Sequence, residues 1–179
     1  SVFYAARRGK PTRIAYSDGE DERVLRATQI VLEEGLTRPG LIGRPEVIAA
    51  RLEKIGSRLE MGKHFDVIDP SSQDHHKECW SAYHDLMRRR GVTVEIAKAR
   101  MRKHNTLIGA MLVRLGYADG LISGLTGYFD KHLQYIEDVI GKAPGCSTLA
   151  GMNHLILPGR SVFLCDTHVN ENPSAEQLV

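Results

Sequence analysis

The stretch TRIAYSDGEDERVLRATQIVLEEG, residues 12–35, decides the fold predicted for this chain. Residues 13–17 favour a short β-strand, and an acidic turn follows them. Small and apolar residues then recur at the spacing of one helix face: Val24, Ala27, Thr28 and Val31. Asp21 and Glu22 lie near the expected start of this helix, where negative charge suits the helix dipole, and Gly35 is a natural stop. The segment therefore predicts a strand that leads into a helix.

The alternation of strand and helix continues along the rest of the chain. The further expected strands are residues 39–43, 65–68 and 120–123, with a closing pair at 155–157 and 162–165. The further expected helices are residues 44–56, 72–90, 93–104, 106–115 and 129–140. We expect the helix at 106–115 and the strand at 120–123 to be buried, because both are largely apolar. Since parallel strands need a crossover connection, this order predicts an α/β fold, a mostly parallel sheet with helices on both faces.

The predicted domain organisation is an N-terminal arm or linker, residues 1–11, followed by the first part of a single domain, residues 12–179. Asn172 and Pro173 suit an N-cap and a first helical turn, yet the sequence ends at Val179 before that helix has completed two turns. We therefore expect a fragment of a domain, with part of its sheet or cleft contributed by residues outside this sequence.

The composition is that of an ordinary globular protein. The chain has 179 residues, 42% of them hydrophobic, and its 24 basic side chains nearly balance 22 acidic ones. A net charge of +2 does not favour nucleic acid as a partner, and no apolar run approaches the roughly 18 residues of a membrane span. Cys79, Cys146 and Cys165 are odd in number and widely spaced, so we expect reduced thiols buried in a core and a cytoplasmic protein.

The loop that follows the strand at 120–123 is the main candidate site. The sequence GLISGLTG, residues 120–127, is neither a dinucleotide fingerprint nor a P-loop. A strand that ends in Ser-Gly before a short loop and a helix nevertheless places backbone N–H groups at the carboxyl edge of a parallel sheet, where ligands of α/β proteins usually bind. The predicted ligand-binding residues are Ser123, Gly124, Thr126 and Gly127. A tight turn without a ligand is the alternative.

Two other clusters have simpler interpretations. The residues His75, His76, Cys79 and His84 lack standard zinc spacing, and an exposed polar helix face accounts for them, so no metal site is predicted. The basic residues around Gly91 are typical of solvated helix ends, with a phosphate-bearing ligand as the alternative: Arg88, Arg89, Arg90, Arg100, Arg102 and Lys103. Nucleic acid fits less well because aromatic residues make up only 6% of the chain.

Five segments, in order, resemble the phosphotransacetylase (phosphate acetyl/butyryltransferase) family. They are DGEDERVLRAT (18–28), RLGYADGLISG (114–124), QYIEDVIGKAPG (134–145), LILPGRSVFLCDTHVN (155–170) and NPSAEQL (172–178). The resemblance runs from about Arg13 to Val179. The chain is most similar to the variant of this family that is fused to bacterial NADP-dependent malic enzymes, on the segments MRRRGVT (87–93), HNTLIGAMLVRLG (104–116) and DTHVN (166–170).

The resemblance implies the isocitrate/isopropylmalate dehydrogenase-like phosphotransacetylase fold, a two-lobed α/β domain with coenzyme A in its cleft. It implies that this chain is roughly the first half of such a domain, with Asn170 and Glu176 as further ligand-binding candidates. In the malic-enzyme variant it implies a module that senses acetyl-CoA or a related thioester and assembles homo-oligomers, dimers within a hexamer or octamer. NADP and a divalent metal, Mg or Mn, would then bind outside this chain, which itself would hold no cofactor.

Two departures from the family pattern bear on catalysis. Active transferases resemble one another in an arginine after Glu-Leu and in a Leu-Arg-Pro motif, and this sequence has Met87 and Gln134 at those positions. The family's catalytic Ser-Arg and Asp lie in the second half of the domain, so no catalytic residue is expected here. Neutral Met and Gln cannot offer a charge-assisted partner to a phosphoryl oxygen. The resemblance thus implies a regulatory domain without transferase activity; the alternative is an active phosphate acetyltransferase or butyryltransferase whose arginines come from the missing half.

Overall fold

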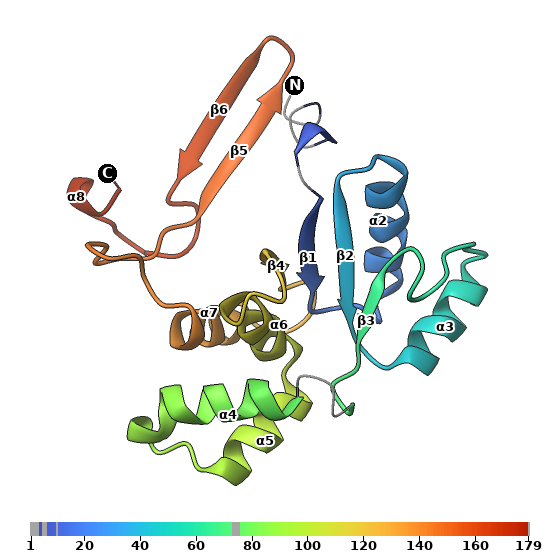
Figure 1. The fold of residues 1–179 in the computed structure, drawn as a ribbon. Helices are drawn as coiled ribbons and strands as arrows, with labels where there is room; N and C mark the ends of the chain where they lie inside the picture. Colours follow the sequence, from blue (N-terminus) through green and yellow to red (C-terminus); the bar gives the residue numbers. More distant parts are fainter. Residues whose placement is uncertain (1–3, 5–6, 10, 73–75, 179) are drawn as a thin grey trace. The chain divides into compact units, whose positions relative to one another are not determined.

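The computed structural model describes residues 4, 7–9, 11–72 and 76–178 (Figure 1). The chain divides into two compact units, Ser1–Ile140 and Gly141–Val179. The predicted boundary between an arm at 1–11 and a domain at 12–179 is not tested by this division and stays a prediction.

Four parallel strands form the sheet of the first unit. They are β1 (Thr12–Tyr16), β2 (Thr37–Ile42), β3 (Asp66–Ile68) and β4 (Gly120–Ile122), in the order β3-β2-β1-β4. Ile14 of β1 lies opposite Pro39 of β2 on one side and Gly120 of β4 on the other. The α/β fold with a parallel sheet is therefore confirmed.

Helices cover both faces of this sheet (Figure 1). They are α2 (Glu22–Glu33), α3 (Pro45–Lys54), α4 (His76–Met87), the 3-10 helix η1 (Arg88–Arg90), α5 (Val94–Lys103), α6 (Asn105–Arg114) and α7 (Phe129–Val139). Since successive side chains of a strand point to opposite faces, Tyr16 and Leu41 pack with α2 and α3, whereas Ala15 and Ile42 pack in the core that contains α4 to α7.

Helix α6 lies at the centre of that second core. Every residue from Thr106 to Leu112 is buried, which confirms the prediction from its apolar sequence. Gly109 lets the helix approach β4 closely, because a Cβ at this position would lie 2.4 Å from Leu121 Cδ1. This close packing therefore fixes where residues 104–106, at the N-terminal end of the helix, lie relative to the carboxyl edge of the sheet.

Strand order creates a switch point beside β1. The connections through α2 and α3 carry the chain from β1 to β2 and on to β3 in one direction. The long connection through α4, α5 and α6 then returns it to β4, on the other side of β1. In open α/β sheets, ligands usually bind outside the carboxyl ends of strands at such a point. The segments after β1 and β4 are therefore expected to form the ligand-binding site.

Several local predictions differ from the structure. The buried residues of α2 are Leu25 and Thr28 and Ala27 is exposed, because the larger Leu25 packs in the core with Leu41. Strand β4 is not buried, with Ile122 55% exposed, because it is the edge strand and pairs with β1 alone among the described residues. Cys79 is buried as expected, but Cys146 and Cys165 are exposed.

The second unit contains an antiparallel hairpin, β5 (Met152–Leu157) and β6 (Arg160–Cys165), and the short helix α8 (Ala175–Leu178). The hairpin confirms the expected strand pair and its turn at Pro158 and Gly159. Helix α8 begins later than Asn172 and Pro173 predict. Ser174 precedes its first residue, and the Ser174 N–H donates to Gln177 Oε1 at 2.8 Å, a contact typical of a helix start. No helix among the described residues is long and apolar enough to cross a membrane.

Candidate functional site

The carboxyl ends of β1 and β4 are joined by hydrogen bonds. The Ser17 N–H donates to the Ile122 carbonyl at 3.0 Å, and the hydroxyl oxygens of Ser17 and Ser123 lie 2.9 Å apart. Asn105, in the first turn of α6, donates its side-chain N–H to the Ser17 carbonyl at 2.9 Å. Two strand ends and one helix start therefore converge at the switch point.

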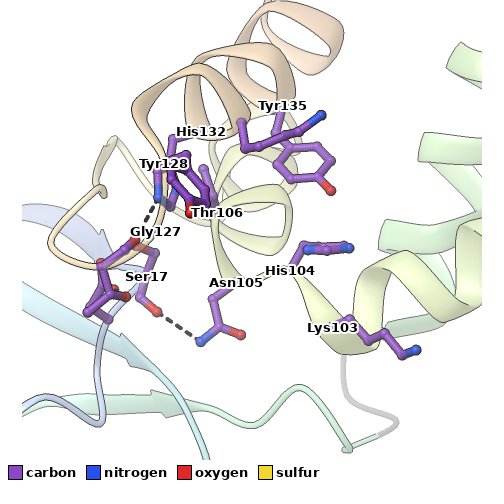
Figure 2. Close-up of a pocket in the computed structure, with 12 residues that line it drawn as sticks. Ser17, Lys103, His104, Asn105, Thr106, Gly127, Tyr128, His132 and Tyr135 are labelled. Carbon is purple, nitrogen blue, oxygen red and sulfur yellow. Dashed lines mark hydrogen bonds between the residues drawn. The ribbon is translucent and has the colours of Figure 1, made fainter.

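A pocket of about 530 Å³ opens beside this junction (Figure 2). Its walls come from the segment after β1, the junction between α5 and α6, the turn before α7 and the first two turns of α7. The lining residues are Ser17, Asp18, Lys103, His104, Asn105, Thr106, Thr126, Gly127, Tyr128, Lys131, His132 and Tyr135. The volume suits a small ligand or one portion of a larger one.

Hydroxyl groups and one imidazole form the polar floor of this region. The Thr106 hydroxyl oxygen lies 2.7 Å from Ser123 Oγ and 2.6 Å from His132 Nδ1, and Thr106 is almost completely buried. His132 Nε2 lies 2.7 Å from the Thr126 carbonyl oxygen (Figure 2). Ser17 donates to Asp18 Oδ2 at 2.8 Å. Each polar group of the floor thus has a partner, which fixes its position before any ligand binds.

The turn that carries Thr126 and Gly127 is anchored on Asp18. The Thr126 hydroxyl donates to Asp18 Oδ1, and the Leu125 N–H lies 3.4 Å from Asp18 Oδ2. Gly124 and Gly127 have φ angles of 102° and 94°, a region that residues with a side chain rarely adopt. The glycines are therefore required by the shape of the turn.

Charge around the pocket is mixed. Lys103 and Lys131 supply cationic groups and Asp18 an anionic one. Burial lowers the pKa of His104, and the nearby charges of Arg100 and Lys103 lower it further, so the neutral imidazole is favoured. Its ring lies 5.0 Å from that of Tyr135, centroid to centroid. The lining offers hydroxyl, amide and ammonium groups to a ligand, together with aromatic surface.

Arginine is absent from the lining of this pocket, as far as the structure describes the chain. Met87 is 5% exposed and packs in the core at the end of α4, and Gln134 is exposed on α7. The Arg90 guanidinium forms an ion pair with Asp138 at 2.8 Å, whereas Arg88 and Arg89 are exposed on η1. The family resemblance implies an arginine at the positions of Met87 and Gln134. Neither residue therefore brings a guanidinium group to the pocket.

The structure divides the predicted ligand-binding residues among three places. Thr126 and Gly127 line the pocket. Ser123 and Gly124 line a second, more apolar cavity of about 520 Å³ between the β4 end and α2, and Ser123 also joins the polar floor. Asn170 and Glu176 belong to the second unit.

Within the second unit, Asn170 has a structural contact that the sequence does not reveal. Its side chain donates to the Leu149 carbonyl at 2.7 Å and to Asp166 Oδ2. Although burial of Asp166 opposes its ionisation, N–H donors from Gly151, Asn170 and Val169 hold the pKa of its carboxyl well below the usual range. Glu176 is exposed in α8. A ligand-binding role for Asn170 and Glu176 stays a prediction.

Several residues of the site were not predicted from the sequence: Ser17, Asp18, Asn105, Thr106 and His132. The polar pair that follows the first strand was a usable signal, because it lies at the same sheet edge as Ser123. Thr106 and His132 gave no such signal, since one lies in an apolar helix and the other is an ordinary polar residue of an amphipathic helix. The described residues contain no cluster of three or more metal-ligating side chains; His75 lies outside them.

Comparison with known proteins places this geometry in a family. A sequence profile described as phosphate acetyl/butaryl transferase matches residues 1–179. The chain belongs to the phosphate acetyl/butaryl transferase family. A solved phosphotransacetylase from Staphylococcus aureus has the same fold, with a TM-score of 0.87 at 23% identity over 98% of this chain and 52% of that one. The predicted family and its fold are confirmed.

Sequence relatives include two kinds of enzyme. The NADP-dependent malic enzyme of Haemophilus influenzae is 44% identical over 177 residues, which are 99% of this chain and 23% of that protein. The phosphate acetyltransferase of Thermoanaerobacterium thermosaccharolyticum is 30% identical over 184 residues, 99% of this chain and 54% of that protein. The chain thus spans under a quarter of the malic enzyme's length and about half of the transferase's.

Proposed function

We propose that this chain is a regulatory, non-catalytic phosphotransacetylase-like part of an NADP-dependent malic enzyme. In this proposal it binds acetyl-CoA or a related thioester and takes part in a homo-oligomer, dimers within a hexamer or octamer. Malate oxidation, NADP and a divalent Mg or Mn ion belong to regions outside the chain. The identity of 44% to a malic enzyme supports the parent protein, and three cysteines that form no disulfide support a cytoplasmic location.

One observation carries the proposal of binding without transfer: the pocket at the switch point is lined by hydroxyl, amide and lysine groups but by no arginine of the described chain. Losing a single preorganised donor to a developing charge costs about 2.7–4 kcal/mol of transition-state stabilisation in other enzymes. Recognition of the remainder of a thioester ligand uses contacts that do not depend on that donor. Binding can therefore persist where group transfer is slow.

The test is an assay of the full-length protein that carries this chain. Malate oxidation and particle mass are measured with and without acetyl-CoA, and acetyl-CoA is expected to change at least one of them. By thermodynamic linkage, the size of the shift bounds the difference in acetyl-CoA affinity between the two states of the protein. Unchanged kinetics together with unchanged assembly would contradict the proposal.

Lysine variants test whether the pocket is the binding site. Replacing Lys103 or Lys131 with Ala is expected to weaken the acetyl-CoA effect about threefold to tenfold, because each removes a cation from the pocket lining. The matched control is Lys77→Ala, which removes a lysine from the exposed surface of α4, away from the pocket lining. An equal effect of the control variant would place the binding site elsewhere.

The second candidate function is a working phosphate acetyltransferase or butyryltransferase. The identity of 30% to a phosphate acetyltransferase, over 99% of this chain, favours it. Formation of acetyl-CoA from acetyl phosphate and CoA by the full-length protein distinguishes the two candidates. Turnover comparable with that of active transferases would replace the regulatory proposal with this one.

A further inference from the structure

Six residues from five segments of the first unit form a closed ring of hydrogen bonds at the carboxyl edge of the sheet. The ring passes through the segment after β1, the end of β4, α6, α7 and the turn before α7. Its members, in order, are Asp18, Ser17, Ser123, Thr106, His132 and Thr126. Thr126 contacts Asp18 through its hydroxyl group and His132 through its carbonyl group, so the turn is held at two points.

The geometry at His132 fixes the position of its proton. A carbonyl oxygen only accepts hydrogen bonds, so the contact of 2.7 Å between His132 Nε2 and the Thr126 carbonyl requires an N–H at Nε2. In the neutral imidazole, Nδ1 is then an acceptor, and the Thr106 hydroxyl at 2.6 Å donates to it. His132 therefore connects the buried helix α6 to the backbone of the turn.

The geometry at Asp18 fixes the other half of the ring. The carboxylate only accepts, so the Ser17 hydroxyl donates to one oxygen and the Thr126 hydroxyl to the other. The Ser17 hydroxyl oxygen also lies 2.9 Å from that of Ser123, which continues the ring toward Thr106. Thr126 is thus held by Asp18 through its side chain and by His132 through its carbonyl.

Gly127 shows that the turn and the imidazole fit closely together. Its φ is 94°, and a Cβ at this position would lie 3.0 Å from His132 Nε2, closer than most Cβ contacts. With the carbonyl of Thr126 engaged, the peptide plane between Thr126 and Gly127 has one orientation at the pocket edge. Both residues line the pocket, as does His132.

We propose that His132 is a positioning residue for ligand binding in the pocket. Its Nε2–H holds the Thr126 carbonyl, so that an entering ligand meets a turn that is already ordered. Because the turn is already ordered, less conformational entropy is lost on binding, and the ligand binds more tightly. The inference rests on the proposed function, since acetyl-CoA is the ligand used to test it.

Two conservative variants separate this role from general support of the fold. In His132→Gln the side-chain amide reaches the position of Nε2 and can still donate to the Thr126 carbonyl. In His132→Asn the amide reaches the position of Nδ1 and keeps the contact with Thr106 alone. Isothermal titration of the full-length protein with acetyl-CoA is expected to give near-native affinity for the Gln variant and about tenfold weaker affinity for the Asn variant.

Hydrogen exchange without ligand provides a readout that does not depend on the proposed function. Amides of residues 123–132 are expected to exchange faster in the Asn variant than in the Gln variant, at an unchanged midpoint of thermal unfolding. Should the Asn variant fail to fold, Thr126→Val releases the same turn from Asp18 and is expected to give the same loss of affinity and faster exchange. His84→Gln, on α4 and outside the pocket lining, is the matched control.

The outcomes are distinct. If the native protein does not bind acetyl-CoA, the proposed function fails, and the exchange measurement alone decides the role of His132. Equal exchange of residues 123–132 in the Gln and Asn variants overturns the positioning role. Where the native protein does bind acetyl-CoA, equal affinity of the two variants overturns it as well.

Discussion

At the scale of single residues, the site depends on glycine as much as on its polar side chains. Gly127 combines a φ of 94° with close approach to His132, so two separate constraints exclude a larger residue. Gly91 has a similar φ of 81°, yet a Cβ there would meet nothing within 4 Å. Comparing substitutions at Gly127 and Gly91 therefore distinguishes the effect of backbone strain from the effect of contact with the imidazole of His132.

Replacing either glycine with Ala should lower the free energy of unfolding by about 1–2 kcal/mol, because both require a left-handed backbone. Acetyl-CoA affinity should fall for Gly127→Ala and stay native for Gly91→Ala, since the added methyl group displaces His132 in the first variant alone. Chemical denaturation and titration calorimetry measure the two quantities. Equal affinities of the two variants would show that the contact with His132 is unimportant.

At the scale of elements, local sequence signals placed the helices well but not always their faces. The start of α2 is set by Asp21, whose side chain accepts from the Arg23 N–H at 2.8 Å. Hydrogen bonds from the Arg23 side chain and backbone lower the pKa of Asp21 to about 2. Such a lowered pKa stabilises the fold above the ordinary value of 3.8, and the contribution is lost as the pH falls toward 2. The buried face of α2, by contrast, was set by packing against β2.

The variant Asp21→Ala is expected to lose about 1 kcal/mol of unfolding free energy at pH 7, because it removes the cap of α2. Asp21→Asn keeps an oxygen acceptor for the Arg23 N–H and should recover most of this loss. Denaturant titration of both variants measures the difference. If Asn is as destabilising as Ala, the charge interaction with Arg23 is the important contribution instead of the cap.

At the scale of the whole molecule, the two units differ in how their sheets are protected. Strands β1 and β2 are covered by helices on both faces, as parallel sheets require. In the second unit β5 and β6 pair only with each other among the described residues, and most of their residues are exposed. An isolated two-stranded hairpin is marginally stable in water.

Hydrogen exchange of this 179-residue chain should therefore be at least about tenfold faster at Met152–Leu157 and Arg160–Cys165 than at Thr12–Tyr16 and Thr37–Ile42. Mass spectrometry of peptic peptides measures all four segments in one experiment. Helix α6, buried throughout its centre, is the internal reference for slow exchange. Similar protection of both sheets would mean that the hairpin has a stabilising partner in solution.

The sequence by itself determined the order of strands and helices, the parallel character of the main sheet and the place of the Ser123–Gly127 loop at its carboxyl edge. These features follow from the periodicity of neighbouring residues, which is a local property. The tertiary structure alone decided that β1 lies next to β4, and so brought Ser17 against Ser123, 106 positions later in the chain. The contacts of Thr106 and His132 arise in the same way. Such pairings depend on strand order and on how the helices pack, and local spacing does not encode them.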